Sequence, residues 1–131
     1  MSENSILSPT NSDHLVYLDN KTFKSPLHYL YYYTYTTTEA EKEKVFKAPT
    51  VDVLLGYGFQ LKSLQLNKTE LNELVYTLIM FLYCTYEDFR KEVMKLRRRP
   101  RPKIHIVNDS YYGFNKEKYA KALKTFSMFI T

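Results

Sequence analysis

The sequence predicts a mainly α, single-domain protein with a few short strands. Residues 74–86 form the longest apolar run, and apolar side chains recur there at helical spacing. The chain contains only three glycines and five prolines, too few for a β-sandwich with many tight turns. Its 131 residues and hydrophobic content of 44% fit one domain with a buried core.

The N-terminal part is expected to hold an arm, a strand and a helix. Residues 1–13 are polar and rich in serine and asparagine, which is typical of a flexible arm, so the folded domain is expected to span residues 14–131. Residues 14–18 fit a short strand that a turn follows. Ser25-Pro26 places an N-cap before a proline at the first helical position, and this predicts a helix through Tyr35.

The middle of the chain reads as helices. Residues 39–46 form a charged helical segment, and Thr50 is expected to cap a short helix that stops at Gly56. The strongest helix spans residues 67–89, with Thr69 as its expected cap, and residues 86–88 can divide it from a second helix. The apolar side chains at helical spacing are Leu71, Leu74, Val75, Leu78, Ile79, Leu82 and Tyr86.

The C-terminal part begins with a basic loop, because prolines at positions 100 and 102 disfavour a helix. Residues 103–107 alternate polar and apolar side chains like a short strand, and residues 116–129 predict an amphipathic helix.

Positive charge is concentrated in this loop. The chain carries a formal net charge of +5, and its remaining residues are close to neutral. The clustered cations are Lys95, Arg97, Arg98, Arg99, Arg101 and Lys103. Since arginine forks bind phosphate, the loop indicates a contact with nucleic acid or another polyanion, with a nuclear-localisation patch or a solvated loop as alternatives.

Three further features of the sequence bear on cellular location and membrane contact: its cysteine content, its N-terminal residues and its longest apolar run. Cys84 is the single cysteine and lies in an apolar run, so we expect a buried thiol and no intramolecular disulfide. No secretory signal pattern opens the sequence, and the apolar run is shorter than the roughly 20 residues that span a bilayer. The expected location is intracellular and cytoplasmic, with the nucleus or a virion as alternatives and no membrane contact.

The chain contains 13 tyrosines, and the helix after Ser25 is crowded with them. Tyr31, Tyr32 and Tyr33, with Tyr29 and Tyr35, cover every side of that helix, so some rings are expected to be exposed or to meet a partner. Three interpretations stay open: core packing, a protein–protein interface, and a stacking platform for bases or a nicotinamide.

Several stretches resemble, in order and with similar gaps, segments of the NADAR family with its YbiA-like members. The first reads LDNKTFKSPLHYLYYYTY and resembles the family opening VDGKxWPSxEHYFQAxKF. Another reads APTVDVLLGYG and resembles SPxxAxxxGR, and a third reads KIHIVNDSYYG and resembles LVExxxxDxYWG. The resemblance, which covers residues 16–126, implies a mostly helical single-domain NADAR/YbiA-like fold. It also implies cleavage of N-glycosidic bonds in ribosylated or ADP-ribosylated compounds.

Several positions depart from the family pattern. Leu27 stands at the family glutamate and Thr34 at the lysine that closes the same helix. The Lys-Phe pair that closes the family's long helix falls near Tyr83-Cys84, and the arginine after the glycine is replaced around Tyr57. Glycosidic cleavage needs a placed carboxylate or nucleophile and a proton donor, and losing such a group costs factors of about 10² to 10⁴.

Some positions still match the family. His28 and Asp109 are the remaining catalytic candidates, and the resemblance places ligand contacts at Tyr29, at Gly113 and at Tyr112, which replaces a tryptophan. Both candidates also have structural interpretations, a partly buried helix histidine with a backbone or tyrosine partner and an Asx-turn aspartate.

Three functional hypotheses follow. The first is a catalytically degenerate NADAR-like domain that serves as a binding, interaction or structural protein, with a protein partner or a second copy as its partner. A viral or phage accessory protein would suit that loss of catalytic groups. The second is an active N-glycosidase, and the third is a small nucleic-acid-binding protein. No cofactor is expected, and the three histidines lie too far apart in sequence to predict a metal site.

Overall fold

The computed structural model describes residues 6–9, 11–34, 38–57, 68–96 and 116–129. Within these residues the chain is mainly α, as the sequence predicts, with six helices and one antiparallel two-stranded hairpin. The elements are, in order, β1 (Val16–Leu18), β2 (Lys21–Phe23), α1 (Pro26–Thr34), α2 (Glu39–Lys47), α3 (Val51–Gly56), α4 (Lys68–Thr85), α5 (Glu87–Lys95) and α6 (Lys116–Phe129).

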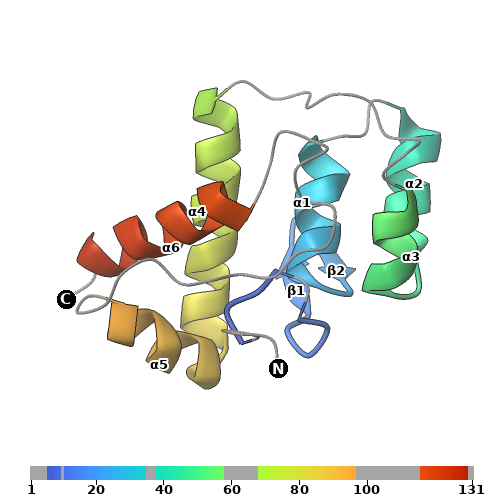
Figure 1. The fold of residues 1–131 in the computed structure, drawn as a ribbon. Coiled ribbons are helices and arrows are strands. Elements are labelled where there is room, and N and C mark those ends of the chain that lie inside the picture. The colour runs from blue at the N-terminus through green and yellow to red at the C-terminus, as the bar shows by residue number, and fades with distance from the viewer. Residues whose placement is uncertain (1–5, 10, 35–37, 58–67, 97–115, 130–131) are drawn as a thin grey trace.

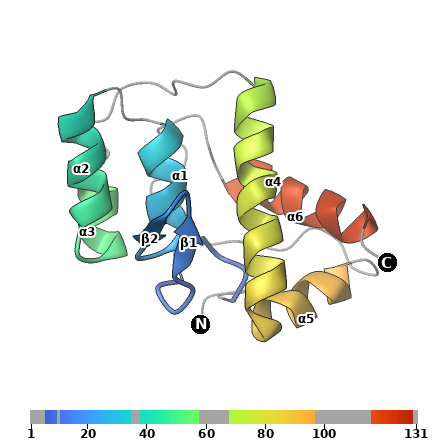
Figure 2. The same cartoon turned by 180° about the vertical axis from the view of Figure 1, so that it is seen from behind.

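The long helix α4 and the shorter helix α1 lie at the centre of the arrangement (Figure 1). Helices α2 and α3 pack on the side of α1 that faces away from α4, while α6 crosses α4 and α5 lies at its C-terminal end (Figures 1 and 2). The hairpin contacts both α1 and α4. Helices from both ends of the chain therefore enclose one core.

The hairpin turns at Asp19 and Asn20. Both residues have positive φ, 56° and 62°, which is the signature of a type I′ turn between two strands. Asp and Asn tolerate this left-handed conformation better than most residues, which explains why a turn without glycine forms here. The turn fixes the register, in which Val16 faces Phe23 and both side chains are fully buried.

Helices α1, α2 and α3 begin where the sequence supplies caps. The Ser25 hydroxyl oxygen accepts the His28 backbone N–H at 3.2 Å, and Pro26 occupies the first helical position. Thr38 and Glu41 form a capping box at α2. Thr50 accepts the Val53 N–H at 3.1 Å, which confirms the expected cap of α3.

The break between α4 and α5 falls at Tyr86, within the segment expected to divide them. Tyr86 has an extended backbone, with φ of −112° and ψ of 118°. The Arg90 side chain satisfies the end of α4, since it donates to the carbonyl oxygens of Tyr83 at 3.1 Å and Cys84 at 3.3 Å. The expected cap at Thr69 is wrong, because α4 already begins at Lys68.

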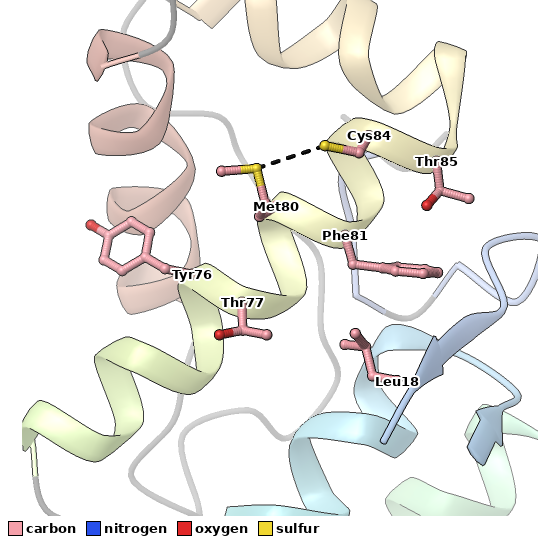
Figure 3. A pocket seen from close by; sticks show the side chains of 7 residues that line it. All are labelled: Leu18, Tyr76, Thr77, Met80, Phe81, Cys84 and Thr85. Atoms are coloured by element: carbon pink, nitrogen blue, oxygen red, sulfur yellow. Dashed lines mark hydrogen bonds between the residues drawn. The ribbon is translucent and has the colours of Figure 1, made fainter. Parts of the chain in front are cut away.

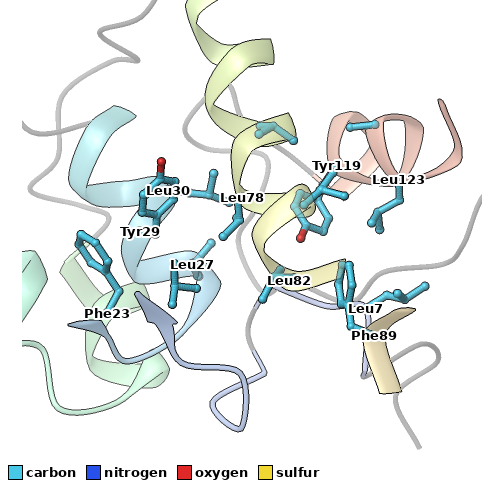
Figure 4. Packing of buried hydrophobic residues seen from close by; sticks show 14 of the residues in the cluster. Leu7, Phe23, Leu27, Tyr29, Leu30, Leu78, Leu82, Phe89, Tyr119 and Leu123 are labelled. Carbon is cyan, nitrogen blue, oxygen red and sulfur yellow. The ribbon is translucent and has the colours of Figure 1, made fainter. Parts of the chain in front are cut away.

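The core joins all these helices to the N-terminal segment (Figure 4). Its largest fully buried side chains are Leu7, Phe23, Leu27, Leu30, Leu54, Leu78, Ile79, Leu82, Phe89, Tyr119 and Leu123. Leu7 is 1% exposed, and the Pro9 carbonyl oxygen accepts the Leu27 N–H at 2.8 Å. The described part of residues 1–13 is therefore packed on the domain, unlike the flexible arm that its polar composition suggests.

Helix α6 matches the helix expected at residues 116–129. The strand expected at residues 103–107 lies outside the described residues. Among the helices that the structure describes, none combines the length and the apolar character needed to cross a bilayer.

Candidate functional site

An open groove runs between β1 and one side of α4 (Figure 3). Its volume is about 530 Å³, which lies within the range of small-molecule pockets. The side chains that line it are uncharged: Leu18, Tyr76, Thr77, Met80, Phe81, Cys84 and Thr85. This groove can accept apolar groups, with hydroxyl groups at Tyr76, Thr77 and Thr85 available for a few polar contacts.

Cys84 lies in this groove and is exposed, so the prediction of a buried thiol is wrong. Its Sγ lies 3.7 Å from the Sδ of Met80, one helical turn earlier, and Met80 is 50% exposed. The helical spacing in the sequence already indicates that Cys84 is on the exposed side of α4. Thr77, Met80 and Cys84 are three and four residues apart and lie opposite the buried Leu78 and Leu82.

His28 is 1% exposed, and both of its ring nitrogens have partners. Nδ1 lies 2.7 Å from the Ser25 hydroxyl, and Nε2 lies 3.0 Å from the carbonyl oxygen of Ala48. The neutral imidazole fits both contacts, with Nε2–H donating to Ala48 and the Ser25 hydroxyl donating to Nδ1. Burial lowers the pKa of His28 below 6.5, and the positive charge of Lys24 acts in the same direction.

The residues that flank His28 on α1 are also core residues. Leu27 is 1% exposed. Thr34 is fully buried and donates its hydroxyl to the Leu30 carbonyl oxygen at 2.6 Å. Tyr29 is 3% exposed, and burial together with the charge of Asp19 raises its pKa to about 12. None of these groups lines the groove.

The tyrosines of α1 divide between the core and its border. Tyr31 is 3% exposed, so its ring is not the surface contact expected for it, because helix packing covers that side of α1. Tyr32 and Tyr33 are half-buried. Tyr32 packs edge-on against Phe23 and against Tyr33, with the two tyrosine ring centroids 4.9 Å apart, and the Tyr33 ring is tilted against Phe23. The Tyr33 hydroxyl donates to Asp19 Oδ2 at 2.5 Å, and burial and this contact raise its pKa.

His14 is a second buried histidine. The sequence did not predict its role, because no motif near His14 indicates its partner. It is 2% exposed, and its Nε2 lies 3.0 Å from Oδ1 of Asp88, 74 residues away. Its ring centroid lies 4.6 Å from that of Tyr86. Its Nδ1 is buried and has no hydrogen-bond partner in the described part of the chain. His14 therefore ties the N-terminal segment to the start of α5.

The other predicted site residues lie outside the described residues. These are Asp109, Tyr112, Gly113, Arg97, Arg98, Arg99, Arg101 and Lys103. Within the described ranges, no three His, Cys, Asp or Glu side chains gather as metal ligands would.

No family model matches this chain, and no curated protein or solved structure matches it. Function is therefore inferred from the side chains described above.

Proposed function

We propose that this chain is a non-enzymatic binding domain, a degenerate relative of the NADAR/YbiA-like fold that acts through its surface. The observation that carries the proposal is the environment of His28. Its ring is 1% exposed and both nitrogens are engaged, with Ser25 and with Ala48. A general acid or base must reach the proton that it transfers, and this imidazole is instead part of the packing between α1 and the end of α2.

The residues around His28 add to this support. Leu27 and Thr34 occupy the positions of the family glutamate and lysine, and both side chains are buried in the core. Neither side chain carries the charge that stabilises the transition state of glycosidic cleavage, and the Thr34 hydroxyl is buried and donates to the Leu30 carbonyl oxygen. The losses therefore affect both ends of α1, where a replacement group would need space that the core already fills.

The described surface supports binding instead. Leu15 is 47% exposed, Tyr17 58% and Met80 50%, and Tyr17 and Met80 belong to the two elements that border the groove. Met80 lines the groove, and a protein partner or a second copy of the chain bound there would cover this apolar surface.

The proposal is tested with ADP-ribose and NAD. We expect neither compound to raise the melting temperature, and we expect no release of ADP-ribose from an ADP-ribosylated substrate above the rate of His28→Gln. A shift that survives high salt, with turnover that His28→Gln abolishes, would instead establish the glycosidase alternative. Light scattering after size exclusion reports in the same series whether the chain assembles with itself.

A second candidate function rests on the clustered cations between Lys95 and Lys103. Six positive charges there can neutralise phosphates, and binding to single-stranded DNA would then weaken steeply with salt. Fluorescence anisotropy at several salt concentrations measures this slope. Replacing Arg97, Arg98 and Arg99 by alanine is expected to reduce it, and an unchanged slope would remove the nucleic-acid function.

A further inference from the structure

We draw no further inference here: the strongest candidate, the open groove between β1 and α4 that Met80 and Cys84 line, carries none, because nothing in the described part of the structure shows what covers it.

Discussion

The Nε2 atom of His28 lies 3.0 Å from the carbonyl oxygen of Ala48, the C-cap residue directly after α2. This hydrogen bond joins α1 to the connection between α2 and α3. Beside it, Lys24 donates to the Lys47 carbonyl oxygen at 3.3 Å. Because the last carbonyl groups of a helix have no partners within it, side chains from another element satisfy the end of α2 here. The histidine that a catalytic function would need thus serves to hold helices together.

Stability is expected to fall as the pH drops below about 6.5, the ordinary pKa of histidine. Burial lowers the pKa of His28 in the folded protein, so the unfolded chain takes up the proton first and proton binding favours unfolding. The contribution of His28 is fully present above 6.5 and is lost between that value and its folded pKa. Urea denaturation between pH 5 and 8 measures the free energy of unfolding.

His28→Gln is the control for this pH dependence. The variant lacks the titrating group, so its free energy of unfolding should vary less over the same pH interval. Equal slopes for wild type and variant would show that His28 does not cause the acid sensitivity.

Ser25→Ala is expected to destabilise the protein by about 1–3 kcal/mol. The substitution removes the N-cap of α1 and leaves the buried Nδ1 of His28 without its partner. Ser12→Ala, at an exposed position, is the matched control and should change the free energy of unfolding little. A similar, small effect of both substitutions would contradict the assigned role of the Ser25 hydroxyl.

Asn20→Ala is expected to cost about 1–2 kcal/mol, because alanine tolerates the left-handed backbone of the turn poorly. Asn20→Gly should retain or slightly increase stability, since glycine suits the second position of a type I′ turn. Thermal denaturation of the two variants measures the difference. The type I′ assignment would be refuted by an alanine variant as stable as the glycine variant.

Leu7→Ala is expected to destabilise the protein by about 2–5 kcal/mol, because Leu7 is 1% exposed and its removal leaves a cavity in the core. Leu15→Ala removes the same side chain where it is 47% exposed and should cost much less. Chemical denaturation of the pair decides whether the N-terminal segment belongs to the core. Equal costs would show that it does not.

Cys84 is expected to react with a thiol reagent in the native protein, because its side chain is exposed. Labelling with a maleimide, followed by mass spectrometry, should give one adduct without denaturant. Labelling that requires urea would place the thiol in the core. The control is Cys84→Ser, which should give no adduct in either condition.

Local patterns predicted most of the described elements well. Ser25-Pro26 and Thr50 mark helix starts through their own backbone preferences and side-chain hydrogen bonds, which act over three or four residues, and α3 ends at Gly56 as expected. The apolar spacing of residues 74–86 likewise predicted the core side of α4. The errors were the cap at Thr69, the burial of Cys84 and the flexible arm over residues 1–13. The second followed from reading the apolar run as a whole rather than as two sides of a helix.

The candidate site was much less accessible to sequence reasoning. His28 was identified by its place in a motif, yet its environment depends on Ala48, which lies 20 residues away. The groove joins Leu18 to α4 side chains from residue 76 onward, and no local signal connects them. The same applies to Tyr86 and Leu15, which are 71 residues apart.

The sequence by itself determined the mainly α class, the limits of most helices and the turn of the hairpin. These depend on backbone conformation and capping, which neighbouring residues control. Only the tertiary structure decided that His28, Leu27 and Tyr31 are core residues, that Leu7 completes the core, and that Cys84 lies in an open groove. Burial depends on which elements pack together, and those contacts join residues that are distant in the chain.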